Sequence, residues 1–332
     1  MSPLDHIRVA CIGFVFDTVA QAIMRDIAPP GFALSFAERP QEQTDEGLAA
    51  CDVIMTVAPV TEAMMLKAPR LRLIQKWGIG VDKIDLTAAE RHGIHVAITA
   101  GANADTIAEH TILLMLAVLR RLVVADRAVR AGRWIPAEIR PQSRKLAGKT
   151  VGIVGFGNIG RAVARQLQGF ATQILYHDAR GPLDAGTPAG ATYVALEDLL
   201  VRSDILTLHV PGGDANRHLL DKAALARMKR GAVIINSARG NLIHENDLAD
   251  ALESGQLSGA GLDVFETEPL GADSRLRQFD NVVLTPHSAG SVMDDVAPMA
   301  AHCFANIQRF LRGEAIAAAD VIVRPARPRI LS

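Results

Sequence analysis

Short, continuously apolar runs alternate with amphipathic stretches along almost the whole chain, and this alternation limits the fold more than any other feature. The apolar runs are 7–12, 53–57, 71–75, 95–98, 150–154, 173–176, 205–209, 232–236, 261–264 and 282–285. The amphipathic stretches between them include 160–167, 219–228 and 245–253. A strand that is apolar on both faces is covered on both faces, as in a parallel sheet flanked by helices. The pattern predicts an α/β protein built on doubly wound parallel sheets.

Two long helical stretches interrupt this alternation. Residues 105–130 read as an apolar helix and its continuation, and residues 298–311 form a late helix with no strand after it. A length of 332 residues favours two domains. We therefore expect a discontinuous domain, 1–101 with 291–332, around a continuous domain, 102–290. The Ala-, Pro- and Arg-rich tail after Gly313 is expected to be peripheral.

Charge and cysteine content exclude several classes of partner. The chain has 35 Lys and Arg and 36 Asp and Glu residues, so it has no basic excess for nucleic acid or an anionic membrane surface. Its most apolar stretch, 112–119, is far shorter than the about 20 residues that span a membrane. The three cysteines form no CxxC pair, which fits a reducing compartment and offers no cysteine-based metal site. We expect a cytoplasmic protein that binds no nucleic acid, membrane or metal.

A glycine-rich turn joins the apolar strand 151–154 to the helix that follows it. The turn reads Gly155-Phe156-Gly157-Asn158-Ile159-Gly160. Gly155 would allow the tight turn, Gly157 the close approach of a pyrophosphate, and Gly160 the close packing of helix on strand. The N-terminus of the helix offers N–H groups to phosphates. A purely structural turn is the alternative, but the flanking strand and helix favour a Rossmann dinucleotide-binding domain.

Asp178 ends the next apolar run, 18 residues after Gly160. Its carboxylate can accept hydrogen bonds from an adenosine ribose diol and would repel a 2′-phosphate, which favours NAD over NADP. Arg180 leaves NADP open, because an arginine there could bind a 2′-phosphate; a solvated loop charge is its other interpretation. NAD is the expected cofactor.

Three later strands are followed by polar segments, 236–240, 261–270 and 285–290. In open parallel sheets ligands bind beyond the carboxyl ends of the strands. When a hydride moves to or from a carbon bearing oxygen, that oxygen must exchange a proton, and histidine, with an ordinary pKa of about 6.5, suits this step. A carboxylate can orient the imidazole, and an arginine can hold a substrate carboxylate with its planar fork. A histidine, a carboxylate and an arginine together suit the interconversion of a 2-keto acid and a 2-hydroxy acid. These arguments do not select which of the ten histidines takes part.

Six segments, in order and spread over nearly the whole chain, resemble the D-isomer-specific 2-hydroxyacid dehydrogenase family, which includes phosphoglycerate dehydrogenases and glyoxylate/hydroxypyruvate reductases. The segments are 78–85, 103–111, 154–160, 237–240, 261–270 and 285–290. The resemblance implies an NAD-dependent oxidoreductase with a Rossmann domain and a discontinuous, flavodoxin-like substrate domain. It also implies a homodimer joined through the long-helix region after Asn103, and a cleft that closes on the substrate.

The resemblance also implies a role for individual residues. Arg239 would bind the substrate carboxylate and carbonyl, His287 would be the acid/base, and Glu268 would be its partner. Backbone N–H groups of Gly78, Ile79 and Gly80 would hold the carboxylate. The remaining implied cofactor contacts are Asp263 to the nicotinamide carboxamide, Thr106 and Ala238 beside the cofactor, and His209, Val210 and Pro211 on the adenosine side.

Three positions depart from relatives and narrow the substrate. Trp77 stands where many members carry a smaller residue, and Met55 falls where phosphoglycerate dehydrogenases place a phosphate-binding arginine, so we expect both to line the substrate site. Core packing is the alternative for each. Glu268, in place of the glutamine of formate dehydrogenases, argues against formate. Two other functions stay open: a non-catalytic NAD(H)-sensing module of this fold and an NADP-preferring keto-acid reductase.

Overall fold

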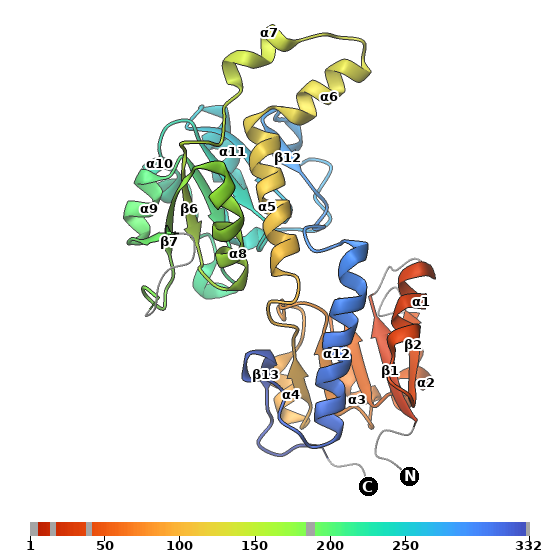
Figure 1. Cartoon of the computed structure of the whole chain (residues 1–332). Coiled ribbons are helices and arrows are strands. Elements are labelled where there is room, and N and C mark those ends of the chain that lie inside the picture. The colour runs from red at the N-terminus through yellow and green to blue at the C-terminus, as the bar shows by residue number, and fades with distance from the viewer. Residues whose placement is uncertain (1–5, 14–17, 38–41, 184–189, 330–332) are drawn as a thin grey trace. The chain divides into compact units, whose positions relative to one another are not determined.

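The computed structural model describes residues 6–13, 18–37, 42–183 and 190–329 (Figure 1). The chain forms two compact units. Unit 1 comprises Met1–Asn103 and Val292–Ser332, and unit 2 comprises Ala104–Ser291. Each unit is built around its own sheet.

Unit 1 contains a six-stranded sheet with the strand order β13-β5-β4-β3-β1-β2. Its strands are β1 (Ile7–Ile12), β2 (Phe32–Ala37), β3 (Val53–Thr56), β4 (Leu73–Lys76), β5 (His95–Ala97) and β13 (Val321–Val323). Its α-helices are α1 (Thr18–Ile27), α2 (Asp45–Ala50), α3 (Glu62–Lys67), α4 (Leu86–Arg91) and α12 (Val296–Leu311). All neighbouring strands are parallel except β13, which runs antiparallel to β5.

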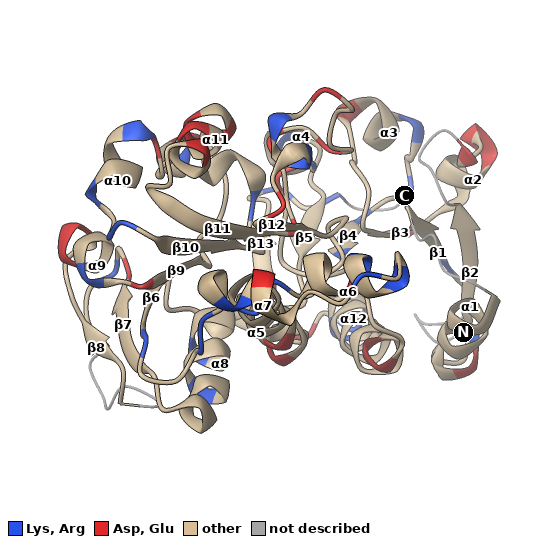
Figure 2. Cartoon of the chain, turned by 90° about the horizontal axis from the view of Figure 1, so that it is seen from above, with Lys and Arg blue, Asp and Glu red and all other residues tan. Residues whose placement is uncertain are grey.

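Helices cover both faces of the unit 1 sheet. Helices α1 and α12 lie on one face, and α2, α3 and α4 on the other (Figure 2). Each face buries its own apolar cluster, with Met24 and Phe304 in the first and Leu48 and Met65 in the second. The doubly covered strands explain why most of them are apolar on both sides.

Two strands of unit 1 lie outside the expected apolar runs. Strand β2 alternates between more and less exposed residues because it is an edge strand, and it therefore contains no continuous apolar run. The expectation of a peripheral tail was wrong. Residues 321–323 extend the sheet, and the Arg329 amide donates to Gly93 O at 2.8 Å.

Unit 2 contains a seven-stranded, wholly parallel sheet with the order β12-β11-β10-β9-β6-β7-β8. Its strands are β6 (Thr150–Val154), β7 (Gln173–His177), β8 (Thr192–Tyr193), β9 (Ile205–Leu208), β10 (Ala232–Asn236), β11 (Leu257–Leu262) and β12 (Val282–Leu284). Its α-helices are α5 (Ala104–Leu119), α6 (Leu122–Arg130), α7 (Pro136–Ile139), α8 (Asn158–Gln166), α9 (Leu196–Arg202), α10 (Lys222–Arg227) and α11 (Glu245–Glu253).

Helices α5 and α8 cover one face of this sheet, and α9, α10 and α11 cover the other (Figure 2). The expected helix over 105–130 is divided in two, because Arg121 adopts a left-handed conformation with φ of 56° between α5 and α6. The prediction of two doubly wound α/β domains is confirmed, with β13 as an antiparallel addition.

Neighbouring strands of unit 2 end side by side. Asn236 of β10 pairs with Leu262 of β11, which pairs with Leu284 of β12. The segments that follow these three strands therefore emerge next to one another at the carboxyl edge of the sheet. No α-helix in the described part of the chain is long and apolar enough to cross a membrane.

Candidate active site

The glycine turn after β6 has three glycines with three different surroundings. Gly155 has φ of 89°, and a Cβ there would lie 2.4 Å from His209 O. A Cβ on Gly160 would lie 2.2 Å from Gly155 O, so only glycine lets α8 start this close to the strand. Gly157 caps α8, and nothing lies within 4 Å of where its Cβ would be.

This turn fits a dinucleotide. The open space at Gly157 lies at the N-terminus of α8, where unpaired N–H groups and the helix dipole favour phosphate. Asn158 is exposed at the first position of the helix, while Ile159 packs partly against the core. The turn thus leaves room for a pyrophosphate on the side where the backbone can bind it.

Asp178 lies just beyond β7, next to the turn. Its Oδ2 accepts a hydrogen bond from the Phe156 amide at 2.8 Å, which ties Asp178 to the glycine turn. Arg180 is also bound to it, with Nε 2.8 Å from Oδ1 and Nη2 2.9 Å from Oδ2. The side-chain hydrogen bonds from Arg180 hold the pKa of Asp178 well below its usual range. Arg180 is therefore more than a solvated loop charge.

His209 follows β9, and Val210 and Pro211 continue the chain from it. Its amide donates to Val154 O at 2.7 Å, which brings the segment alongside the glycine turn. Although the residue keeps some surface, its ring Nδ1 is buried without a partner among the described residues, and burial lowers the pKa of His209 to about 3. The imidazole is neutral at physiological pH.

Arg239 lies in the segment after β10, and two features fix its backbone. Asn236 Nδ2 donates to Arg239 O at 2.8 Å, and its Oδ1 accepts from the Ala238 amide at 3.1 Å. Gly240 packs so closely on the next segment that a Cβ would lie 2.0 Å from Phe265 O. The guanidinium Nη1 donates to Ala238 O at 2.6 Å.

His287 and Glu268 lie together, although 19 residues separate them. His287 Nδ1 is 2.9 Å from Glu268 Oε2 and 3.0 Å from Oε1. About half of the His287 side chain is exposed, whereas Glu268 is more covered. Since the carboxylate holds a proton on Nδ1, Nε2 is the nitrogen that can exchange a proton with a bound molecule.

Asp263 holds the turn that carries His287. Its buried carboxylate accepts hydrogen bonds from the Thr285 hydroxyl at 2.6 Å, the Ser288 amide at 2.8 Å and the Ala289 amide at 2.9 Å. The His287 amide donates to Asp263 O at 2.7 Å, and His287 itself has φ of 53°. A side chain in the left-handed region needs such support, because this conformation is unfavourable for residues other than glycine.

The expected contact of Asp263 with a nicotinamide carboxamide is not available to its side chain as it lies. The carboxylate has no exposed surface, and protein donors surround both of its oxygens. Its position instead makes it a support for His287.

Two residues that the sequence analysis did not single out, His110 and Thr285, belong to this support. His110 of α5 has its Nε2 3.1 Å from Thr285 Oγ1 and 3.5 Å from Asp263 Oδ1. Both lie in segments that resemble the family, and that resemblance could have pointed to them. Thr106, one helical turn before His110, is half-buried on α5.

The five candidate residues of unit 1 differ in their surroundings. Gly78 has φ of 93°, and its amide already donates to Thr99 Oγ1 at 2.8 Å. Among the described residues, nothing accepts from the amides of Ile79 and Gly80, so only these two remain for an anion. The expectation of three available amides is therefore reduced to two.

Met55 is a core residue. It is fully buried on β3 among side chains that include Val9, Met24 and Phe304. Trp77 is half-buried and packs against the same cluster. Because a side chain without exposed surface cannot contact a ligand, the alternative of core packing replaces substrate binding for Met55.

Comparisons with known proteins agree with this arrangement. Residues 112–289 match the model of the D-isomer specific 2-hydroxyacid dehydrogenase NAD-binding domain. A glyoxylate reductase of Korarchaeum cryptofilum is 39% identical over 81% of this chain and 82% of its own. A hydroxypyruvate reductase of Thermotoga maritima is 38% identical over 73% and 78%, respectively. The crystal structure of an NAD-dependent formate dehydrogenase from Staphylococcus aureus in complex with NAD superimposes with a TM-score of 0.84 and 28% identity, covering 96% of this chain and all of the other.

The chain belongs to the D-isomer specific 2-hydroxyacid dehydrogenase family. It is an oxidoreductase of 2-hydroxyacids with NAD as its cofactor. The predictions of family, cofactor and enzyme class made from the sequence are thereby confirmed. No group of His, Cys, Asp and Glu side chains in the described residues could hold a metal ion.

Proposed function

We propose that this enzyme reduces a small, unphosphorylated 2-keto acid to the corresponding 2-hydroxy acid: glyoxylate to glycolate, which is achiral, or hydroxypyruvate to the D-isomer of glycerate. When bound, NADH would donate a hydride to the keto acid, and NAD would accept one from the hydroxy acid. His287 Nε2 delivers the proton to the carbonyl oxygen in reduction and takes it back in oxidation. The contact of both Glu268 oxygens with His287 Nδ1 carries this proposal, because it orients the ring and stabilises imidazolium.

Arg239 is the proposed carboxylate ligand. Its backbone is held between Asn236 and the close approach of Gly240 to Phe265, and its segment lies beside the one that carries Glu268. A planar guanidinium can bind a carboxylate and a neighbouring carbonyl oxygen together. The free amides of Ile79 and Gly80 support a substrate-binding role for unit 1.

The similarity to a glyoxylate reductase and a hydroxypyruvate reductase supports the choice of substrate. Glu268 supports a keto acid over formate.

A panel of acids tests the proposal. Glyoxylate, hydroxypyruvate, pyruvate and 3-phosphohydroxypyruvate are supplied with NADH, and formate with NAD, while the NADH absorbance is followed. We expect the highest kcat/KM for glyoxylate or hydroxypyruvate. Preference for the phosphorylated acid or for formate would contradict the substrate assignment. Binding of NADH without turnover of any acid would instead favour an NAD-sensing module.

We further propose that a second copy of the chain covers the α5–α7 region. Trp134, between α6 and α7, is 81% exposed, and Leu122 and Val129 of α6 are each more than half exposed. Apolar side chains gathered in this way mark protein–protein contacts. Sedimentation should give a dimer, and Leu122→Asp with Trp134→Glu should give a monomer; a monomeric parent chain would contradict this proposal.

A cytoplasmic location is also proposed. Cys11, Cys51 and Cys303 are free, buried thiols, which supports a reducing compartment. Cell fractionation of a tagged chain tests this location.

A further inference from the structure

Four hydrogen bonds occupy the carboxylate of Asp178. Oδ1 accepts from the Arg180 amide at 3.0 Å and from Arg180 Nε at 2.8 Å. Oδ2 accepts from the Phe156 amide at 2.8 Å and from Arg180 Nη2 at 2.9 Å. An ionised carboxylate offers about four acceptor positions, so these bonds use its capacity.

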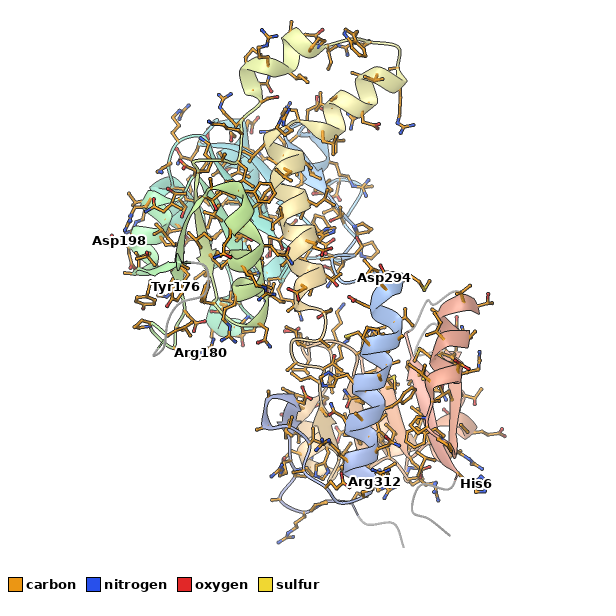
Figure 3. All side chains as sticks on the ribbon, in the orientation of Figure 1. His6, Tyr176, Arg180, Asp198, Asp294 and Arg312 are labelled. Atoms are coloured by element: carbon orange, nitrogen blue, oxygen red, sulfur yellow. The ribbon has the colours of Figure 1, made fainter. Side chains whose placement is uncertain are left out.

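The four donors fall into two kinds. The amides of Phe156 and Arg180 belong to the backbone of the turns around Asp178, and they stay in place while those turns are folded. The guanidinium belongs to a side chain that is 74% exposed, and it can rotate away into solvent (Figure 3). It supplies two N–H donors, and an adenosine ribose diol would bring two O–H donors to the same oxygens.

We propose that Arg180 sets the cofactor preference: its guanidinium competes with the ribose diol of NAD for Asp178 and, once displaced, binds the 2′-phosphate of NADP. This inference rests on the proposed NAD-dependent reaction, and it takes the dinucleotide to bind at the Gly155–Gly160 turn with its adenosine ribose at Asp178. Arg180 therefore reduces the preference for NAD over NADP in two ways: it weakens the binding of NAD, and it strengthens the binding of NADP.

The penalty on NAD is small. Although Asp178 is mostly buried, the guanidinium is open to solvent, and such an ion pair shifts an equilibrium by up to about 5-fold. Salt weakens an exposed pair further, since charges are screened over about 8 Å at physiological ionic strength.

The gain for NADP is larger. A 2′-phosphate carries two negative charges next to Asp178, which repels it. The guanidinium, two residues along the chain, is the matching fork for a phosphate, and charge-assisted pairs are about twice as strong as neutral hydrogen bonds. Without Arg180 the repulsion from Asp178 is left unopposed.

The first test measures KM for NADH and for NADPH with a saturating keto acid in the parent enzyme, Arg180→Ala and Arg275→Ala. Arg275 is the matched control: it lies in the same unit and pairs with two carboxylates, Asp250 at 2.7 Å and Glu253 at 2.8 Å, away from the turn. We expect Arg180→Ala to lower KM for NADH about 2- to 5-fold and kcat/KM for NADPH by about 10-fold or more. Arg275→Ala should change neither the KM for NADH nor the kcat/KM for NADPH.

The second test uses ADP-ribose and its 2′-phosphate as probes in calorimetry, so that it needs no turnover. Arg180→Ala should tighten ADP-ribose and weaken the 2′-phosphate form, and high salt should reduce both differences. If these shifts occur while no keto acid is reduced, the proposed reaction fails and the inference stands. If the keto acid is reduced but Arg180→Ala leaves NADH binding unchanged or weaker, the competition is overturned. An unchanged affinity for the 2′-phosphate probe overturns the phosphate contact.

Discussion

Asp263 in unit 2 and Asp320 in unit 1 are both buried carboxylates that hold a neighbouring segment and contact a histidine of a long helix. Asp320 Oδ1 accepts from the Ala100 amide at 2.8 Å, and its Oδ2 lies 2.7 Å from Nε2 of His302 on α12. Asp263 accepts from the amides of Ser288 and Ala289, and His110 of α5 stands beside it.

The two sites differ in what they hold. Asp263 supports the left-handed His287, which lies against Glu268. Asp320 supports 98–100, the segment after β5, which carries no proposed acid/base; its Thr99 instead accepts from the Gly78 amide, next to the proposed anion-binding amides. A buried aspartate beside a helix histidine thus supports the turn of the proposed acid/base in one unit and a segment without a proposed acid/base in the other. A substitution of Asp263 should therefore lower both kcat and the free energy of unfolding, whereas a substitution of Asp320 should lower the free energy of unfolding and leave kcat near the parent value.

The largest effect is expected for the group that Asp263 supports. His287→Ala should lower kcat at least ~100-fold, because it removes the proposed acid/base. Steady-state assays with NADH and the best keto acid measure this. Near-normal turnover would remove His287 from its role and leave the turn with a structural function only.

Arg239 lies in a segment of unit 2 that the Asp263 carboxylate does not hold, so a substitution there probes the site independently of Asp263. Arg239→Lys should raise KM for the keto acid by about 10-fold or more, because an ammonium cannot replace a bidentate fork. The KM for NADH should stay within about 2-fold of the parent value. An unchanged KM for the keto acid would contradict the proposed carboxylate contact.

The matched pair Asp263→Asn and Asp320→Asn tests the comparison directly. In each variant an amide NH₂ meets donors that the carboxylate accepted, which removes about 1–3 kcal/mol of stability. Asp263→Asn should also lower kcat by about 10-fold or more, since a small displacement of a reacting group slows catalysis strongly.

Asp320→Asn should keep kcat near the parent value while its Tm falls. Activity at a temperature where both variants are folded separates the two effects. Equal losses of kcat in both variants would show that the two aspartates do not differ in this way.

The smallest effect is a pH dependence of stability. Burial by itself would raise the pKa of Asp263, but hydrogen bonds from His110, Thr285, Ser288 and Ala289 outweigh it and hold the pKa below its ordinary value of 3.8. The unfolded chain therefore binds a proton more readily than the folded one. The stability supplied by Asp263 is present above pH 3.8 and is lost as the pH falls through the lowered value.

Urea unfolding measures the free energy of unfolding of the parent chain and of Asp263→Asn. The difference between the two free energies should shrink as the pH is lowered below 3.8. A difference that grows toward acid pH would mean that the pKa of Asp263 is raised and not lowered.

Much of the fold could be predicted from the sequence, because strands covered on both faces leave continuous apolar runs. Strands β1, β6 and β10 have the predicted bounds. Strand β2 was missed because an edge strand alternates, and β13 because three residues in a polar tail carry no periodic signal.

The candidate site divides in the same way. The residue types and spacing of the sequence predicted the glycine turn, the cofactor and the three polar segments at the ends of later strands, because chemistry of this kind needs particular side chains there. The resemblance of six segments to the family pointed to Arg239, Glu268 and His287 within those segments. Only the tertiary structure decided that Met55 lies in the core, that Asp263 faces the turn of His287, that Thr99 takes the Gly78 amide, and that Arg180 covers Asp178. These outcomes depend on which segments pack together and which donors then lie within reach of a given acceptor. Segments far apart in the chain set both, and no local sequence pattern records them.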